Sequence, residues 1–263
     1  EFLGKTVQVI PHVTNEIKDR IQSLAGKDFD ILITEIGGTV GDIESLPYIE
    51  TVRQLKFEKN QDSIVIHLTL IPFLKATGEL KTKPTQHSVK TLLQYGVQPD
   101  ILVCRSEMNL DESVKNKIAL FCNVQKKSVV ESIDTESIYN VPLLLQKQGL
   151  DIEVLKKLKI NKYSKPNLRK WNTFLNRLNS PKKETCIAVV GKYVELKDSY
   201  KSIYESLIHA GVQTNCKVTV KWVHSNNVNK KEAKNIFKKC SGIIVAPGFG
   251  ERDIQGKLCS IEY

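Results

Sequence analysis

Three lysines, a proline and several small polar residues are concentrated in the stretch GELKTKPTQHSVK, from Gly78 to Lys90. Lys81 and Lys83 flank a threonine just before an expected helix, and Pro84 presets the entry into that helix. Lysine ammonium groups hold phosphate oxygens as point charges, and the free N–H groups at a helix start favour an anion. The stretch therefore predicts a site for a polyanion such as a triphosphate. A solvated basic loop is the alternative.

A lone carboxylate followed by glycines occurs in ILITEIGGTVGDIES, residues 31–45. We expect Ile31–Thr34 to form a buried parallel strand, which would place Glu35 at its carboxyl end, where open α/β sheets bind ligands. The glycines that follow would let the backbone approach a ligand closely. One carboxylate at that position suits Mg²⁺ shared with nucleotide phosphates. An ordinary strand end followed by a tight turn and a helix cap would explain the same residues.

A third candidate is the turn in SGIIVAPGFGERD, residues 241–253. An apolar strand, Ile243–Ala246, leads into glycines, and such a turn can direct a backbone N–H at an oxyanion. An ordinary loop between a strand and a helix explains this pattern equally well.

The elements that would position these residues alternate along the chain. Strand patterns cover residues 63–71, 100–105 and 128–133, and helical patterns cover residues 46–58, 87–96 and 111–121. Strand–helix alternation predicts an α/β fold with a mostly parallel sheet and helices on both faces. Residues 161–183 are polar and lack a strand pattern, so we interpret them as a helical linker. Alternation then resumes from residue 184. We therefore predict two domains, residues 1–160 and 184–263.

Bulk composition narrows the functional classes. The net charge of +10 could indicate nucleic-acid binding, but the lysines are dispersed along the chain and aromatic residues are not interleaved with them. We therefore expect no nucleic-acid partner. The six cysteines form no C-x-x-C pair, so the sequence has no zinc-ribbon pattern. Scattered cysteines of this kind are typical of proteins in a reducing cytosol. The longest apolar run, IVIHLTLIPFL, is too short to span a bilayer. We expect a cytoplasmic protein without a membrane partner.

Several segments together resemble the CTP synthase family. They are EIGGTVGDIESLPYIETVRQL, GELKTKPTQHSVKTLLQYGVQPDILVCR, SIYNVPLLLQKQGLD, VVGKYVELKDSYKSIYESLIHAG and GFGERDIQGK. The resemblance runs from about Lys5 to Lys257. It implies a P-loop-type synthetase domain followed by a flavodoxin-like class I glutaminase domain. The implied activity is a ligase reaction: ATP phosphorylates O4 of UTP, and ammonia from glutamine displaces the phosphate to give CTP.

The resemblance also assigns roles to individual residues. Glu35 matches a Mg²⁺ ligand, and Gly248 matches a glycine that binds glutamine through its backbone. Asp42, Ile43 and Glu44 match a segment associated with inhibitory CTP. Ile133, Asp134 and Thr135 align with an ATP-contacting segment, with side chains that differ from the bacterial pattern. The residues matching the shared UTP and CTP segment are Lys81, Thr82, Lys83, Pro84, Thr85, Gln86 and Lys117. ATP and glutamine as co-substrates, Mg²⁺, feedback by CTP, activation by GTP and a homotetramer are implied at the same level.

The chain departs from the family pattern in several places. The resemblance places a glycine-rich phosphate loop before Glu1, and no G-x-C-x-G elbow surrounds any cysteine between Glu1 and Tyr263. The resemblance therefore places the glutaminase's catalytic cysteine, histidine and glutamate beyond Tyr263, and we expect no catalytic residue within the chain. The usual P-G-G-F-G turn has Pro247 in place of a glycine, which removes one N–H, and Asp253 replaces a usual glycine.

We accordingly expect the chain to be an internal fragment of a longer enzyme, and we expect this fragment to have no catalytic activity by itself. Another ATP-dependent ligase of the same fold, or a non-enzymatic basic nucleotide-binding module, is the alternative.

Overall fold

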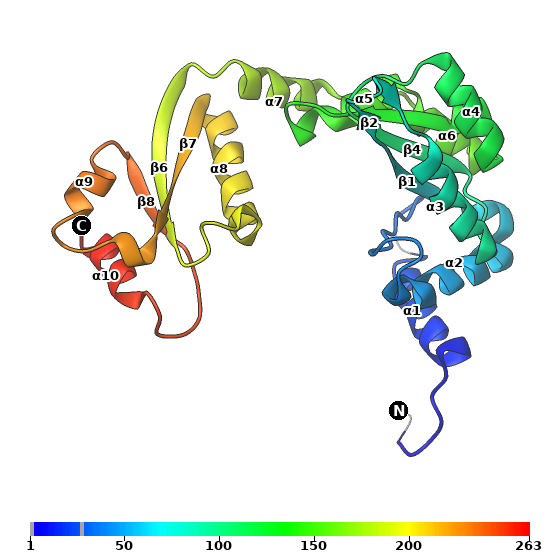
Figure 1. Cartoon of the computed structure of the whole chain (residues 1–263), viewed down its shortest axis with the longest axis horizontal. Coiled ribbons are helices and arrows are strands. Elements are labelled where there is room, and N and C mark those ends of the chain that lie inside the picture. The colour runs from blue at the N-terminus through cyan, green and yellow to red at the C-terminus, as the bar shows by residue number, and fades with distance from the viewer. Residues whose placement is uncertain (1–2, 27–28) are drawn as a thin grey trace. The chain divides into compact units, whose positions relative to one another are not determined.

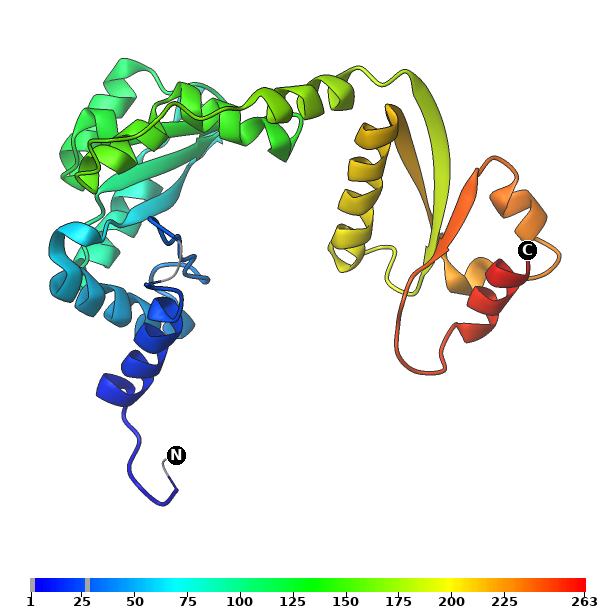
Figure 2. The same cartoon turned by 180° about the vertical axis from the view of Figure 1, so that it is seen from behind.

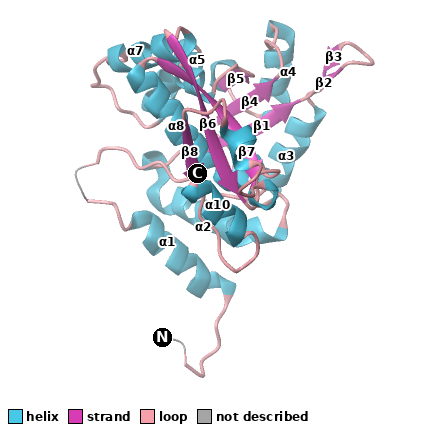
Figure 3. Ribbon diagram, turned by 90° about the vertical axis from the view of Figure 1, so that its left-hand side faces the viewer, coloured by secondary structure: helices cyan, strands magenta, loops and turns pink. Residues whose placement is uncertain are grey.

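The computed structural model describes residues 3–26 and 29–263, which divide into two compact units, residues 1–164 and residues 165–263 (Figure 1). Each unit contains a three-stranded parallel sheet, and strands alternate with helices along the chain (Figure 3). The predicted α/β class with parallel sheets is confirmed. The finer boundaries at 160/161 and 183/184 stay predictions. Within the described ranges no helix has the length and apolar character needed to cross a membrane.

In unit 1, residues 1–164, the sheet has the order β1-β4-β5, and a short antiparallel hairpin, β2–β3, follows its first strand. The hairpin was not predicted. The strands are β1 Ile66–Ile71, β2 Phe73–Leu74, β3 Glu79–Leu80, β4 Ile101–Ser106 and β5 Val129–Ile133. The helices are α1 Thr14–Gln22, α2 Leu46–Lys59, α3 Lys83–Gln94, α4 Glu112–Cys122, α5 Val141–Lys147 and α6 Leu150–Lys157.

Helices cover both faces of this sheet, as the strand–helix alternation predicts. Successive residues of a strand point to opposite faces. Leu102 and Cys104 therefore pack with α3 and α4 residues such as Val89 and Ile118. On the other face, Val103 and its neighbours pack against side chains of α5 and α6. Side chains on both faces of β4 are consequently buried, which explains why the strand begins with a continuous apolar run.

The expectation that Ile31–Thr34 forms a central strand is wrong. These residues are irregular, and the side chain of Ile33 is 90% exposed. A strand persists only where a neighbouring strand satisfies its N–H and C=O groups, and no described strand pairs with this segment. An apolar sequence indicates a preference for burial but does not supply the partner. Glu35 therefore does not stand at the carboxyl end of a strand.

Unit 2, residues 165–263, has the sheet order β7-β6-β8. Its strands are β6 Lys183–Gly191, β7 Cys216–His224 and β8 Gly242–Val245, and its helices are α7 Arg169–Asn179, α8 Lys201–Thr214, α9 Ala233–Phe237 and α10 Ile254–Glu262. Side chains of α8 cover one face of the sheet and those of α9 and α10 the other; both views show α8 beside β7 (Figures 1 and 2). The predicted linker contains α7, where Phe174 contacts His209 of α8 edge-on at 5.8 Å.

Candidate functional site

The carboxyl ends of the three strands in unit 1 lie side by side. Ile71, Ser106 and Ile133 occupy one level of the sheet in register. Just beyond that level, the N–H of Lys81 donates to the carbonyl oxygen of Pro72 at 2.9 Å, and the N–H of Asp134 donates to that of Ser106 at 3.0 Å. The basic stretch and the expected ATP segment therefore share this edge, where open α/β sheets bind ligands.

The basic stretch leaves the sheet through the β2–β3 hairpin and enters α3. Thr82 is the N-cap residue of α3, Lys83 is its first residue, and Pro84 lies in its first turn. Lys83 and Pro84 are exposed, and Lys81 is partly exposed. The ammonium group of Lys81 pairs with the carboxylate of Glu79. Two lysines thus border the N-terminus of a twelve-residue helix, where free backbone N–H groups favour an anion.

Three polar side chains of the predicted nucleotide segment are buried instead of facing solvent. The Thr85 hydroxyl donates to the carbonyl oxygen of Leu70 at 3.1 Å, and the Gln86 amide donates to the Thr82 hydroxyl at 2.9 Å. All three have at most 4% of their surface exposed. The Thr85 bond fastens the start of α3 to the end of β1, and the bond between Gln86 and Thr82 lies within the first turn of α3. The groups left for an anion are therefore the lysine ammoniums and the helix N–H groups, and the roles of Thr82, Thr85 and Gln86 in nucleotide contact stay predictions.

Lys117, predicted from a separate segment, belongs to the same charge cluster. It is exposed on α4. The hydrogen bond and charge of Lys81 lower the pKa of the Glu79 carboxyl, and the charge of Lys117 lowers it further. Two lysines that lie 36 positions apart in the sequence therefore act on one carboxylate. An anion bound to Lys81 would have to displace Glu79.

The segment predicted to contact ATP begins at the last residue of β5, Ile133. The Asp134 carboxylate accepts from the Arg105 guanidinium at 3.2 Å, and both side chains are more than half exposed. The Thr135 hydroxyl donates to the carbonyl oxygen of Ser137 at 2.9 Å. Arg105 thus brings positive charge to this part of the edge.

Glu35 lies in an exposed, irregular part of unit 1. Gly38 and Gly41, which follow it, have φ angles of 86° and 107°, a region that favours glycine. Across residues 3–26 and 29–263, no group of three or more His, Cys, Asp or Glu side chains could hold a metal ion. A single exposed carboxylate fits Mg²⁺ only where phosphates and water complete the coordination.

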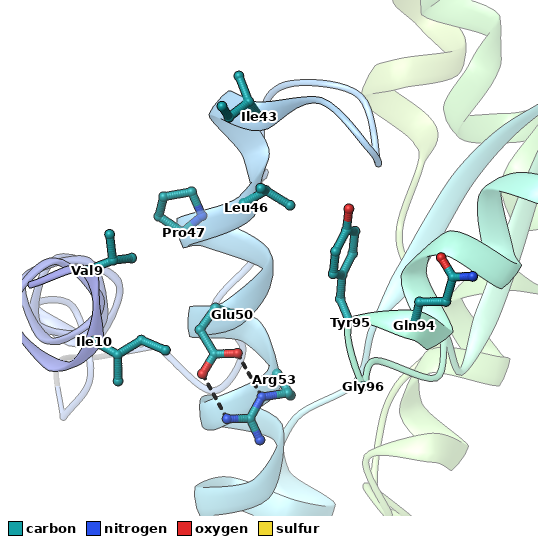
Figure 4. Close-up of a pocket in the computed structure, with 10 residues that line it drawn as sticks. All are labelled: Val9, Ile10, Ile43, Leu46, Pro47, Glu50, Arg53, Gln94, Tyr95 and Gly96. Carbon is teal, nitrogen blue, oxygen red and sulfur yellow. Dashed lines mark hydrogen bonds and ion pairs between the residues drawn. The ribbon is translucent and has the colours of Figure 1, made fainter.

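The segment expected to bind inhibitory CTP precedes α2. Asp42 is the N-cap residue of the short 3₁₀ helix Ile43–Ser45, and Ile43 and Glu44 are exposed. Ile43 also lines a pocket of about 760 Å³ whose wall is mostly apolar (Figure 4). The wall's charged groups, Glu50 and Arg53, pair with each other through two 2.8 Å hydrogen bonds. Its wall is mostly apolar and contains one cationic side chain, Arg53, so the pocket suits a triphosphate less well than the region around Lys81, Lys83 and Lys117 does.

In unit 2, the turn after β8 contains Gly248, the glycine that is predicted to bind glutamine. Lys192, the first residue after β6, is 2% exposed, and its ammonium group donates to the carbonyl oxygens of Phe249 and Gly250 at 2.7 and 2.8 Å. Lys257 of α10 donates to the carbonyl oxygen of Ala246 at 2.8 Å. Burial, and secondarily the charge of Lys192, lowers the pKa of Lys257. A side chain at Gly248 would approach both lysines.

These contacts fix the orientation of the peptide planes in the turn. In a trans peptide the carbonyl and the following N–H point in opposite directions, and no peptide in this turn is cis. Since the carbonyls of Phe249 and Gly250 point at Lys192, the N–H groups of Gly250 and Glu251 point away from it. Pro247 removes one N–H from the turn, but these two remain. Asp253, where the family pattern has glycine, has a φ of 64°, a conformation that Asp tolerates better than most residues.

Tyr263, beyond which the glutaminase triad is expected, has a packing role in unit 2. It is the C-cap residue of α10, and its N–H donates to the carbonyl oxygen of Cys259 at 3.3 Å. Its ring centroid lies 5.5 Å from that of Phe237 in α9. These contacts join α10 to α9. The position of the triad is not tested by the described residues, so it stays a prediction.

Sequence reasoning missed Lys192 as a functional candidate. A lysine directly after an apolar strand usually faces solvent, so GKY in VVGKYVEL gave no signal by itself. The backbone N–H of Lys192 also donates to the Tyr200 hydroxyl at 3.0 Å. Only the three-dimensional arrangement shows that this cation is buried under the turn.

Comparisons with known proteins match both units. Residues 1–160 match the family described as CTP synthase N-terminus, and residues 195–263 match the class-I glutamine amidotransferase family. The whole chain aligns with CTP synthases, at 58% identity for Christiangramia forsetii and Flavobacterium johnsoniae and 50% for Methanocaldococcus jannaschii. The chain spans about half the length of these curated relatives, 48%, 49% and 50% respectively. That coverage does not confirm the expectation of an internal fragment.

Proposed function

The chain belongs to the CTP synthase family, and from that premise we propose that it forms part of a ligase that converts UTP to CTP. In this proposal, ATP phosphorylates O4 of the uracil ring, and ammonia released from glutamine displaces the phosphate. Unit 1 would bind the nucleotides at the carboxyl end of its sheet, and unit 2 would supply part of the glutamine site. The observation that carries the proposal is the position of the basic stretch at the carboxyl end of the sheet and the start of α3, where Lys81 pairs with Glu79 and Lys83 is exposed.

The triphosphate of UTP would bind at this edge. Lys81, Lys83 and Lys117 come from the β3–α3 junction and from α4, so the three ammonium groups can approach an anion from two sides. Each charge-assisted hydrogen bond is about twice as strong as a neutral one. The anion would displace Glu79 from Lys81, and the N-terminus of α3 would add its N–H groups. Asp134 and its neighbours would contact ATP along the same edge.

Glu35 would hold Mg²⁺ together with phosphate oxygens. When bound, the metal would neutralise the charge that accumulates on the transferred phosphoryl group. The family resemblance supports this role, and the exposed carboxylate among glycines is compatible with it.

The regulatory and assembly proposals rest on less. Feedback by CTP would involve Asp42, Ile43 and Glu44, and activation by GTP comes from the family resemblance only. Self-association as a homotetramer is supported by exposed apolar side chains near α1 and α2, including Val9, Ile10, Ile43 and Phe57. A cytoplasmic location would follow from the metabolic role.

Replacing Glu35 by alanine tests the metal assignment in the native protein that carries this chain. CTP formation from UTP, ATP and free ammonia should be lost, while glutamine hydrolysis continues in part. Asp30→Ala is the matched control because Asp30 is an exposed carboxylate in the same irregular segment. Normal CTP formation by Glu35→Ala would overturn the role of Glu35, and absence of CTP formation by the unmodified protein would overturn the proposed function.

A further inference from the structure

Two thiols of unit 2 are in direct contact. The Sγ atoms of Cys186, in β6, and Cys240, before β8, are 3.6 Å apart. Both residues are free and partly exposed. Neither belongs to the glutamine turn, which lies at the other end of β8, where the N–H of Ala246 donates to the carbonyl oxygen of Val190. The proposed function therefore leaves this pair unexplained.

The backbone holds the two cysteines together. β6 and β8 are parallel, with Ile187 opposite Gly242. One residue before that pair, the N–H of Ser241 donates to the carbonyl oxygen of Cys186 at 2.7 Å. Cys240 therefore enters the sheet beside Cys186 at a fixed level. A disulfide needs an S–S distance of about 2.05 Å, so the sulfur atoms must approach by only about 1.5 Å, which side-chain rotation can share.

The other four cysteines differ in their surroundings. Cys104, Cys122 and Cys259 are buried, with at most 6% of their surface exposed. Cys216 is partly exposed, and the partner of its thiol is the carbonyl oxygen of Lys217 at 3.8 Å. Cys104 and Cys122 both lie inside the core of unit 1. Accessibility and thiol contact coincide at Cys186 and Cys240.

We propose that Cys186 and Cys240 are a reversible modification site, which hydroperoxides convert to an intramolecular disulfide. The thiolate of one cysteine attacks the hydroxyl oxygen of the peroxide, the O–O bond breaks, and a sulfenic acid forms as hydroxide, or the alkoxide of an organic hydroperoxide, leaves. The sulfur of the second cysteine then attacks the sulfenic sulfur. The S–O bond breaks, and water leaves with the proton of that thiol. The two thiols lose two electrons, which reduce the peroxide, and a dithiol reductant reverses the change.

The bond should stabilise unit 2 without disturbing the turn. It would close a loop of 55 residues, from 186 to 240, and so restrict the unfolded chain. It lies at the start of β8, whereas Lys192 holds the turn beyond the end of β8. Burial, and then the hydrogen bond with Cys186, raises the pKa of Cys240. The thiolate of Cys240 is therefore scarce near neutral pH, and oxidation should become faster as the pH rises.

Tryptic mapping of the full chain tests the proposal directly. Cleavage after lysine and arginine puts each of the six cysteines in its own peptide, with Cys186 in 184–192 and Cys240 in 240–252. After mild hydrogen peroxide and alkylation of the remaining thiols, we expect a linked 184–192/240–252 species, two hydrogens lighter than the separate peptides and absent after dithiothreitol. Cys216 should stay mostly alkylated.

Variants and stability give independent readouts. Cys186→Ser and Cys240→Ser should each abolish the linked species, whereas Cys216→Ser should keep it. Oxidation should raise the melting temperature of unit 2 by roughly 5 °C or more in the unmodified chain and leave it unchanged in Cys240→Ser. Sulfinic acid at either cysteine, a linkage to another cysteine, or disulfide-linked dimers in place of the intramolecular species would overturn the proposal. The peptide map of the unmodified chain decides this even if a variant fails to fold.

Discussion

The ammonium nitrogen of Lys192 lies 2.7 Å from the carbonyl oxygen of Phe249, and the lysine that reaches it is almost completely buried. Lys192 directly follows the central strand of unit 2, and Phe249 lies in the turn after β8. The hydrogen bond therefore ties the turn to the central strand of the sheet. It also determines which side of the turn presents N–H groups. The stability of unit 2 should depend on this one cation.

Replacing Lys192 by methionine keeps the apolar stem and removes the donor, leaving two carbonyl groups without this partner. The free energy of unfolding of unit 2 should fall by roughly 1.5–3 kcal/mol, the contribution of hydrogen bonds to a charged group. Both tryptophans of the chain, Trp171 and Trp222, lie in unit 2. Urea unfolding followed by tryptophan fluorescence therefore reports on this unit. Lys201→Met, at an exposed position, is the control, and equal midpoints for both variants would contradict the role of Lys192.

Sequence patterns predicted much of this fold because periodicity records burial. The alternation of strands and helices and the helices on both faces of the first sheet follow from local residue types. Ile31–Thr34 shows the limit. Its apolar run has the composition of a strand, but pairing depends on a neighbour elsewhere in the chain, which composition does not reveal.

The candidate site was partly predictable for a similar reason. Lys81, Lys83 and Lys117 are conspicuous as charges, and the first two lie where the sequence predicts them, beyond the carboxyl end of a parallel strand; their role in binding stays a prediction. The burial of Thr85 and Gln86 could not be predicted, because short polar side chains occur both in solvent and in satisfied cores. Lys192 was missed because its role depends on a turn 57 positions away.

Lys83→Ala should weaken UTP binding about ten- to a hundred-fold, since one charge-assisted contact with the triphosphate is lost. Calorimetric titration with UTP in the presence of Mg²⁺ measures the change. Lys90→Ala is a matched control, because Lys90 is also an exposed lysine of α3 but lies nearly two turns further along. A dissociation constant unchanged by Lys83→Ala would return the stretch to the alternative of a solvated basic loop.

Glu79→Gln should have the opposite effect on UTP affinity. The Glu79 carboxylate forms an ion pair with Lys81, and the charge of Lys117 also lowers the pKa of this carboxyl. Removing its charge frees both lysines for the triphosphate, so binding should tighten, and more so at low ionic strength, where exposed charges are less screened. The same titration at two salt concentrations provides the measurement. Weaker binding by Glu79→Gln would show that this carboxylate supports the nucleotide instead of competing with it.

His67 should make the stability of unit 1 depend on pH. Its ring lies 2.9 Å from the Ser88 hydroxyl of α3, and burial lowers its pKa. Between the unperturbed value of about 6.5 and the lowered folded value, the unfolded chain binds a proton that the folded chain does not. The free energy of unfolding should therefore fall as the pH decreases through this window. Urea unfolding followed by circular dichroism should show a smaller pH dependence for His67→Gln than for His87→Gln, where the histidine is exposed. Identical pH profiles would exclude His67 as the source.

The chain by itself should not hydrolyse glutamine. Acyl transfer needs a thiolate with a base beside it, and the hydrogen bonds described for its thiols are with Thr69, with Lys217 and between Cys186 and Cys240, none of them with a histidine. Burial raises the pKa of Cys104 and Cys122 to about 11, so these two stay protonated near neutral pH. Incubation of the purified chain with glutamine should release no glutamate, and a diazoketone analogue of glutamine should label none of the six cysteine peptides. Glutamate release together with labelling of one peptide would identify that cysteine as a nucleophile and change the assignment of unit 2.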